Sequence, residues 1–468
     1  MAVIEVNPGD SIQAAIDEAN ANDTILVNPG TYTEPIQVQG PSLIRIDKPL
    51  TVRSSEGPEV TILNGASAEE RYYVVDIASS DVTLEGFTIK NPDFIGSADA
   101  SGIVTSVTGD FPFSNITVRE NIITEIGSPE RMNVDFGSFG INAGPVNNLR
   151  LSGNRIFDIG HIDPAGWAIG IFVYGNDALN LAENVTIEDN RVYDIRTPGP
   201  VSEAITVGGD TKDFFVRGNR VEAPDEQAAQ VKRGIRTFST VTGPVEISEN
   251  TVRGAAEFGM RLASPAAQTV ERNRIIGNSV GISIASPVVV PPQITYNTFI
   301  ANGTAMVNNS AVAVDAENNF WGSAAGPTPG VDIVGPVDFT PFLQVPPGQP
   351  FVTTGPIANR PPSARPTRQL YVVIENPNDT AVSVQIQGYY LTNTQNLYVL
   401  EQINLAAESS PGSKVSRTYF ANFDEFEFRF LPSDDRVLIS VWGLNANGQL
   451  VDPHRLVNSE LSRFEGDI

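Results

Sequence analysis

The sequence predicts an all-β protein: a parallel β-helix, or solenoid, with an N-terminal capping helix, followed by a small C-terminal β-sandwich. Three observations predict it. Short strand-like segments that end in Asn recur up to residue 319, a Pro-rich stretch follows residue 343, and the chain beyond residue 369 reads as a series of short strands.

The repeated unit is a pair of short strands. The first strand of the pair recurs as ITVREN, LRLSGN, VTIEDN, FFVRGN, VEISEN, TVERN, QITYN and VDAENN, which end at Asn121, Asn154, Asn190, Asn219, Asn250, Asn273, Asn297 and Asn319. Phe87 takes the same place in VTLEGF, and the repeat becomes shorter toward its C-terminal end. The second strand mostly begins with Gly-Ile. Two short strands in so short a repeat leave no room for a helix and fit one coil of a β-helix.

The recurring asparagine has a structural explanation. Asn tolerates the left-handed conformation of a tight turn, and its amide can bond the backbone and the Asn of the next coil. We therefore expect a ladder of asparagines that stabilises the stack and takes no part in chemistry.

The N-terminal segment predicts a cap. Residues 10–20 place Ile12, Ala15, Ile16 and Ala19 on one helical face, and Asp10 with Gln13 makes a start similar to a capping box. Such a helix would cover the open end of the first coil, whose unpaired strand edges otherwise invite aggregation. We assign residues 1–30 to this cap and the first coil, and residues 1–343 to the whole β-helix.

The C-terminal part differs in composition. Residues 344–368 carry seven prolines and predict an extended linker. Residues 369–468 contain roughly seven short strands separated by turn signals, which is typical of a β-sandwich.

Composition excludes several functions. The net charge is −25, so binding to nucleic acid or to an anionic membrane surface is not expected. There is no Cys and there are only two His, which argues against thiol chemistry and His-based metal sites. No apolar run is long enough to insert into a membrane, and the N-terminus MAVIEVNPGD lacks the pattern of a signal peptide.

The two ends of the repeat region carry a resemblance. The opening PGDSIQAAIDEANANDTILVNPGTYTE and the closing AENNFWGSAAGPT, followed by VDFTPFL, resemble right-handed parallel β-helix repeat proteins of the pectin-lyase-like superfamily. The resemblance covers roughly residues 1–343. It implies the fold and leaves the function open, because that superfamily includes lyases, hydrolases, epimerases, tailspikes and non-catalytic surface proteins. The segment ISVWGLNANGQLVDPHRLVNSEL is faintly similar to C-terminal domains on surface proteins of spore-forming bacteria.

Unequal loops indicate where a ligand would bind. In four neighbouring coils the segment between the ladder Asn and the next Gly-Ile strand is clearly longer than in the later coils. These long loops, between residues 121 and 234, would form one wall of a groove. If Ile141, Ile171, Ile205, Ile235 and Met260 point inward, alternation turns Asn142, Phe172, Thr206, Arg236 and Arg261 outward beside that wall.

The outward row and the wall predict a glycan-binding surface. Aromatic rings offer flat faces to sugars, and arginines hold carboxylate or sulfate groups through two hydrogen bonds. The predicted ligand-binding residues are Trp167, Phe172, Tyr174, Thr206, Arg236 and Arg261.

The alternative is catalysis in the same groove, by a polysaccharide lyase or a glycoside hydrolase. Hydrolysis needs two carboxylates, and a lyase needs a base and a cation that neutralises a uronate. The candidate catalytic residues are Asp135, Asp158, His161, Asp163 and Arg236, with Glu203 as a further carboxylate. No cofactor is expected, except Ca²⁺ if the protein is a lyase. The signatures of polygalacturonases, Gly-His-Gly and Arg-Ile-Lys, are missing.

The sequence therefore favours a non-catalytic surface or structural protein that binds glycans. An extracellular place, or one on a spore or virion surface, suits such a rod, and so does assembly into a homo-oligomer, as a trimer or a fibre.

Overall fold

The computed structural model describes most of the 468 residues, in the ranges 1–35, 42–65, 72–92, 99–105, 112–127, 137–160, 166–177, 179–223, 231–286, 288–323, 325–343, 346–347, 351–360, 365–379, 381–392, 395–408, 410–432 and 436–464. The chain divides into two compact units, Met1–Pro347 and Gly348–Ile468. No helix among the described residues is long and apolar enough to span a membrane.

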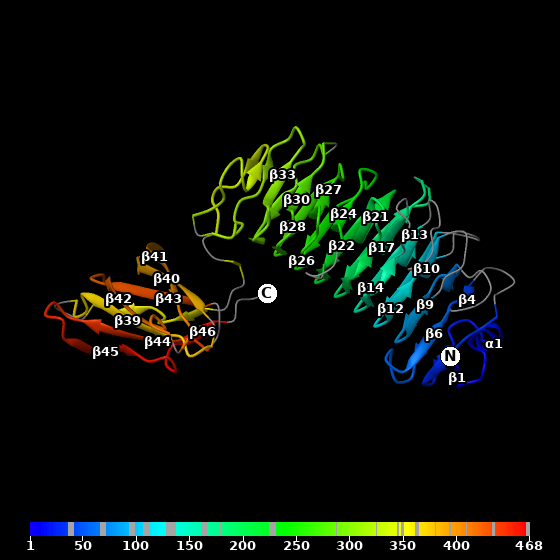
Figure 1. The fold of residues 1–468 in the computed structure, drawn as a ribbon, viewed down its shortest axis with the longest axis horizontal. Helices are drawn as coiled ribbons and strands as arrows, with labels where there is room; N and C mark the ends of the chain where they lie inside the picture. Colours follow the sequence, from blue (N-terminus) through cyan, green and yellow to red (C-terminus); the bar gives the residue numbers. More distant parts are fainter. Residues whose placement is uncertain are drawn as a thin grey trace. The chain divides into compact units, whose positions relative to one another are not determined.

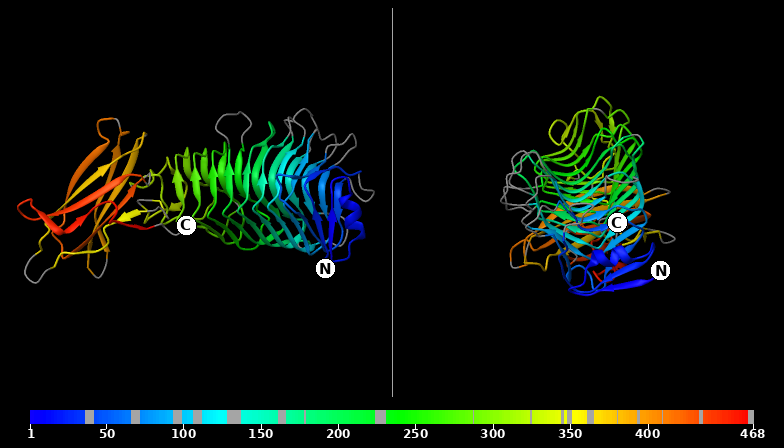
Figure 2. Two further views of the ribbon diagram at one scale, coloured as in Figure 1. Left: turned by 90° about the horizontal axis from the view of Figure 1, so that it is seen from below. Right: turned by 90° about the vertical axis from the view of Figure 1, so that its right-hand side faces the viewer.

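The first unit is a parallel β-helix. Its coils stack one on the next from the N-terminal end, in blue, to the yellow-green coils (Figures 1 and 2). Most coils contribute a strand to each of three sheets, and every pairing among the described strands of these sheets is parallel. This confirms the all-β solenoid that the repeat predicts.

The strands of the three sheets follow in stacking order. Sheet 1 consists of β1 (Val3–Val6), β2 (Thr24–Val27), β5 (Thr51–Ser54), β8 (Val82–Glu85), β11 (Phe113–Arg119), β14 (Val146–Ser152), β18 (Ala182–Glu188), β22 (Thr211–Arg217), β25 (Val245–Ser248), β28 (Gln268–Glu271), β31 (Gln293–Thr295), β34 (Val314–Asp315) and β36 (Val337–Asp338). Sheet 2 consists of β4 (Ser42–Ile46), β7 (Tyr73–Ile77), β10 (Ala100–Thr105), β13 (Gly137–Ala143), β17 (Trp167–Gly175), β21 (Val201–Gly209), β24 (Arg233–Thr237), β27 (Phe258–Leu262), β30 (Val280–Ile284), β33 (Thr304–Asn308) and β35 (Ile333–Val334). Sheet 3 consists of β3 (Gly30–Tyr32), β6 (Thr61–Asn64), β9 (Thr88–Asn91), β12 (Ile122–Ile126), β15 (Arg155–Ile156), β19 (Arg191–Tyr193), β23 (Arg220–Glu222), β26 (Thr251–Arg253), β29 (Arg274–Ile276) and β32 (Thr298–Ile300), with β16 (Ile159–Gly160) and β20 (Ile195–Arg196) beside it.

The asparagine ladder lies at the turn between sheets 1 and 3. Each ladder Asn from Asn121 to Asn297 donates from Nδ2 to Oδ1 of the Asn on the next coil; for Asn219 and Asn250 the distance is 3.0 Å. Asn250 Oδ1 also accepts a hydrogen bond from the backbone N–H of Asn219. Asn219 Nδ2 donates in addition to the carbonyl oxygen of Ile187 at 2.8 Å. Phe87 begins the series, since its N–H donates to Asn121 Oδ1. The predicted structural ladder is confirmed.

The N-terminal cap forms, but its first turn differs from the expected capping box. Helix α1 (Ile12–Glu18) buries Ile12 and Ile16 completely against the first coil. The N-cap is Ser11, whose hydroxyl oxygen accepts from Ala14 N–H at 3.0 Å, so the assignment of Asp10 and Gln13 was wrong. Glu34, from the following coil, accepts from Ile12 N–H at 2.7 Å and thus takes the part that a local Glu or Gln would have played.

The second unit consists of two antiparallel sheets around a common apolar core. One sheet contains β41 (Gln395–Leu405), β40 (Val382–Leu391), β43 (Glu425–Pro432), β37 (Phe351–Thr353), β46 (Ser462–Phe464) and β38 (Ile357–Ala358), and the other contains β42 (Lys414–Phe420), β39 (Gln369–Glu375), β44 (Leu438–Leu444) and β45 (Leu450–Leu456). Both contribute to the core, as Phe428 and Val372 show, so this unit is a β-sandwich. Strands β37 and β38 lie inside the segment expected to be a linker, and pair with β43. Proline is compatible with a strand at edge positions. The high proline content of this segment therefore predicted a linker where two short strands form.

Candidate functional site

A single row of outward side chains runs along sheet 2. In register along neighbouring strands lie Asn142, Phe172, Thr206, Arg236, Arg261 and Ser283. The residues before them point into the core and are at most 1% exposed: Ile141, Ile171, Ile205, Ile235 and Met260. The alternation that the sequence predicts for these strands is therefore confirmed.

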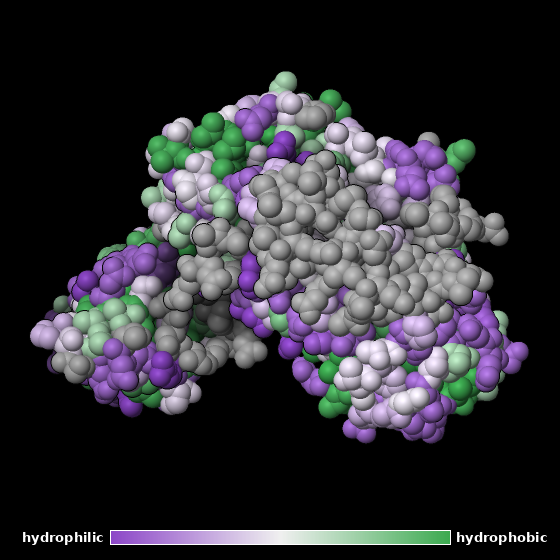
Figure 3. All heavy atoms as spheres, turned by 45° about the vertical axis from the view of Figure 1, so that its right-hand side comes forward, coloured by the Kyte–Doolittle hydropathy of each residue, from purple (hydrophilic) through white to green (hydrophobic). Residues whose placement is uncertain are grey.

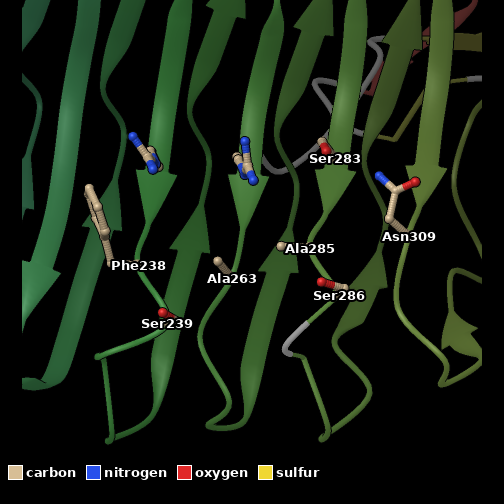
Figure 4. A pocket seen from close by; sticks show the side chains of 9 residues that line it. Phe238, Ser239, Ala263, Ser283, Ala285, Ser286 and Asn309 are labelled. Atoms are coloured by element: carbon tan, nitrogen blue, oxygen red, sulfur yellow. The ribbon is translucent and has the colours of Figure 1, made fainter. Parts of the chain in front are cut away.

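A cavity of about 380 Å³ opens beside this row, at the ends of β24, β27, β30 and β33. Arg236, Arg261 and Ser283 line it from the outward row. The positions two residues further along each strand also line it, and Figure 4 shows them in order as Phe238, Ala263, Ala285 and Asn309; Ser239 and Ser286 complete the lining. The hollow exists because two alanines lie between the large Phe238 ring and the Asn309 side chain, where longer side chains would fill it.

A buried carboxylate holds one of the two cavity arginines. Glu203 on β21 is 0% exposed, and its Oε1 accepts from Arg236 Nη1 at 2.6 Å and from Arg233 Nη1 at 2.8 Å. The Thr206 hydroxyl donates to the other oxygen, Oε2. The Arg236 guanidinium also lies 4.0 Å from the centre of the Phe238 ring. Arg236 is thus fixed from two sides.

Arg261 is held differently. Among the described residues its guanidinium has no carboxylate partner, and it lies over the ring of Phe258 at 5.6 Å. Burial lowers the pKa of Arg261, and the positive charges of Arg236 and Arg233 lower it further. A partly buried cation beside two others is stabilised by an incoming anion. This end of the row therefore suits a carboxylate or sulfate group.

The three predicted aromatic residues all lie on β17, two coils before Arg236. Phe172 and Tyr174 stack on each other, with ring centres 5.0 Å apart, and Phe172 also stacks on Phe139 at 6.0 Å. Trp167, at the start of the same strand, is 47% exposed. Burial raises the pKa of Tyr174. These rings extend the row toward the long-loop coils, although part of each stacked face is occupied by its neighbour.

Thr206, which the sequence predicts to contact the ligand, is not accessible from the surface. Its side chain is completely buried beneath its neighbours, and its hydroxyl is used by Glu203. Thr206 belongs to the outward row, as the alternation predicts, but it serves to position the carboxylate that holds Arg236.

The two described catalytic candidates, Asp158 and Arg236, lie on different sheets. Asp158 lies at a turn of sheet 3 between the equivalent turn residues Glu125 and Asp194, 4.0 Å from Arg196. Burial raises the pKa of Asp158, which the nearby Arg196 partly offsets. Asp135, His161 and Asp163 lie outside the described residues; of the two described candidates, Arg236 lines the cavity and Asp158 does not.

Sequence reasoning missed the residues that shape the cavity. Phe238, Ala263, Ala285 and Asn309 each follow the outward row by two positions, so the same alternation could have found them. It also missed Asp99, which accepts from Gly137 N–H at 2.6 Å and whose pKa is raised by burial. Asp99 interacts electrostatically with Tyr73 and Tyr174, at the N-terminal end of the same face.

A family comparison fits the fold. Residues 119–335 match the family described as periplasmic copper-binding protein (NosD). This match covers the central coils, where the ladder and the three parallel sheets are regular. The match is consistent with the parallel β-helix of the first unit. No curated protein sequence matches the chain.

Solved structures similar to this β-helix protein include three with related architecture. The A-module of the Azotobacter vinelandii mannuronan C-5 epimerase AlgE6 has 15% identity and a TM-score of 0.44, with 72% of this chain and 94% of that chain covered. Pectate lyase Pel9A has 12% identity and a TM-score of 0.43, with 73% and 79% covered. The enzymatically active domain of bacteriophage CBA120 tailspike protein 2 has 13% identity and a TM-score of 0.38, with 99% and 76% covered. At these identities none of the three bears on the activity of this β-helix.

The donor residues that the structure describes do not fit a copper site. The chain has no Cys, and the described His454 lies in the second unit, where its Nδ1 bonds the Thr367 hydroxyl. Met260 and Met306 are completely buried in the core of the β-helix. Over the described ranges, no three His, Cys, Asp or Glu side chains come together in a way that could hold a metal ion.

Proposed function

We propose that the protein is a non-catalytic β-helix of a cell, spore or virion surface that binds an acidic glycan in the cavity beside Arg236 and Arg261. The observation that carries this is the Arg261 guanidinium, partly buried at the cavity and without a carboxylate partner among the described residues. A uronate or a sulfated sugar supplies the missing anion, and the Phe238 ring and the two alanines accept its apolar face.

The chemistry of the lining supports binding over catalysis. The cavity residues are Arg236, Phe238, Ser239, Arg261, Ala263, Ser283, Ala285, Ser286 and Asn309. None is a carboxylate, an imidazole or a phenol, which are the groups that most often transfer protons to and from sugars. The nearest carboxylate, Glu203, is completely buried and fully engaged with two arginines.

The net charge of −25 argues against binding of an acidic sugar, but the charge around the cavity is locally positive. Around the cavity, Arg233, Arg236 and Arg261 outnumber their carboxylate partners Glu203 and Glu257. A locally basic site on an acidic protein can attract an acidic sugar at short range, since exposed distant charges are screened over roughly 10 Å in ordinary salt.

The test compares a galacturonate disaccharide with the corresponding neutral galactose disaccharide by calorimetry. Wild-type protein should bind only the acidic sugar, and Arg261→Ala should lose at least tenfold in affinity. Arg53→Ala, which removes an exposed arginine from sheet 1, is the matched control. Equal binding of both sugars, or unchanged binding by Arg261→Ala, would contradict the proposal.

Catalysis remains the second candidate because of Asp99. Its carboxyl is partly buried, its pKa is raised, and it interacts with the phenols of Tyr73 and Tyr174 on the face that the long loops adjoin. Incubation with a panel of neutral, amino-sugar and uronate polysaccharides, with and without Ca²⁺, decides between the two. New reducing ends above a heat-inactivated control, lost in Asp99→Asn, would make the protein an enzyme.

A further inference from the structure

A file of arginines runs along the outer face of sheet 3, away from the cavity. In register on successive coils lie Arg155, Arg191, Arg220, Thr251 and Arg274. The next residue of each strand points into the core and is at most 1% exposed, so this file faces outward. Figure 1 labels β12, on the coil before Arg155, and β26, which carries Thr251.

The file is accessible to solvent. The side chains of Arg155, Arg191 and Arg220 are 41%, 51% and 60% exposed, and Arg274 is exposed too. Where residues are coloured, the face shown in Figure 3 mixes hydrophilic and hydrophobic side chains. Coils repeat every 4.8 Å on average, and the four steps from Arg155 to Arg274 therefore span roughly 19 Å.

The arginines are only partly neutralised. Arg191 and Arg220 share one carboxylate, Glu222, and Arg155 reaches Glu59 at 3.5 Å. Arg274 has no ion pair with any described residue. Among the residues that the structure describes, these four guanidinium groups thus pair with two carboxylates, on a chain whose net charge is −25. The local excess of positive charge is opposite in sign to the molecule as a whole.

Two aromatic rings form a parallel row beside the N-terminal arginines. Phe157 and Tyr193 stack with ring centres 4.9 Å apart and planes at 4°. The guanidinium groups of Arg155 and Arg191 lie over these rings, at 5.4 Å and 4.8 Å. This stacking fixes the two arginines at the coil spacing, so the cations are arranged before any ligand arrives.

We propose that this file binds a linear acidic polysaccharide along the axis of the β-helix, at a site distinct from the cavity. The argument rests on the repeat: four of five successive coils carry a cation in register, which suits a linear polymer with at most about one anionic group per sugar. Arginine offers each carboxylate or sulfate two parallel donors.

Other polyanions fit less well. Duplex DNA carries far more charge along its axis than four arginines neutralise on an acidic protein. A second copy of this chain would need a complementary acidic file. In the described strands of sheets 1 and 2, no four consecutive coils present acidic residues in register on the outside.

The test measures binding of the full chain to polygalacturonate by biolayer interferometry at low and moderate salt. The variant Arg191→Gln, Arg220→Gln, Arg274→Gln should bind about tenfold more weakly, with a smaller dependence on salt. The control Arg53→Gln, Arg119→Gln, Arg272→Gln removes three exposed arginines from the opposite side of the ladder turn and should bind as wild type does. Oligogalacturonates shorter than the file should bind more weakly than longer ones.

Two further variants keep the proposal falsifiable if the triple variant folds poorly. Arg155→Gln with Arg274→Gln leaves no buried acid unpaired and should still weaken binding severalfold. Glu222→Gln removes a competing carboxylate and should strengthen it. Equal binding of neutral dextran, tighter binding of single-stranded DNA, or unchanged binding in the arginine variants would overturn the proposal.

The file and the cavity can fail separately. If Arg236→Ala with Arg261→Ala abolishes polygalacturonate binding while the file variants have no effect, the cavity stands and the file does not. The reverse result would retain the file and contradict the function proposed for the cavity.

Discussion

Glu203 on β21 and Arg236 on β24 form an ion pair between neighbouring coils, with 2.6 Å between Oε1 and Nη1. The pair connects the buried interior of the long-loop coils to the open cavity, because Glu203 has no exposed surface whereas Arg236 lines the hollow. The orientation of a ligand-binding arginine therefore depends on a residue that no ligand reaches.

Replacing Glu203 by Gln should destabilise the protein by about 3 kcal/mol, because two largely buried guanidinium groups lose their carboxylate. Chemical denaturation followed by circular dichroism measures this. Glu257→Gln is the control: its carboxylate also bonds Arg233 but is 43% exposed, and the loss should stay below about 1 kcal/mol. Similar losses in the two variants would show that the buried position of Glu203 is unimportant.

Filling the cavity should abolish sugar binding without unfolding the chain. Ala263→Leu places a larger side chain between Phe238 and Ala285, where the ligand would lie. We expect at least a tenfold loss of affinity for the galacturonate disaccharide and little change in thermal unfolding. Ala256→Leu, an exposed change in the turn before β27, should affect neither.

An interior break in the asparagine ladder should be costly. Asn219→Ala removes donors to Ile187 and Asn250 and an acceptor used by Asn190, and should destabilise by about 1–3 kcal/mol. Asn28→Ala is the control, since it removes an exposed hydrogen bond from the side-chain amide of Asn28 to Asn7 Oδ1. If chemical denaturation shows the same stability for Asn219→Ala as for this control, the ladder contributes little.

The second unit should lose stability in mild acid. Burial lowers the pKa of His454, and a bond to the Ala358 carbonyl opposes this only in part. The unfolded chain therefore takes up a proton more readily than the folded one, and stability falls as the pH drops below the ordinary histidine value of 6.5. Trp442 fluorescence during thermal unfolding reports on this unit. Wild-type protein should melt earlier at pH 5.5 than at pH 7.5, and His454→Gln should reduce that difference; an identical difference in the variant would rule out His454 as the cause.

Local pattern made the fold predictable. The Asn repeat and the alternation around residues 141 and 142 depend only on neighbouring residues, and the same chemistry recurs on every coil. The cap residue was mispredicted because Glu34, which completes it, lies on the next coil. The sequence predicted that Thr206 is accessible, but it is buried beside Glu203 and Arg236. The spacing of these two residues along the sequence does not show how close together they lie.

The site was predictable only where it follows the outward row. Arg236 and Arg261 could be placed side by side, but the hollow beside them depends on Phe238 being large and Ala263 and Ala285 being small at positions that matter only once the register is known. The arginine file of sheet 3 escaped notice for the same reason, because its members lie on separate coils, at unequal intervals along the sequence.

The ladder also bears on how the molecule can change in length. Each ladder asparagine needs only an Oδ1 acceptor from the equivalent residue of the next coil. The first position of the ladder is Phe87, which donates its N–H to Asn121 but has no Oδ1 of its own. One whole coil can therefore be duplicated or lost while both new junctions keep the bonds they need. The length of such a β-helix can therefore increase or decrease in steps of a single coil.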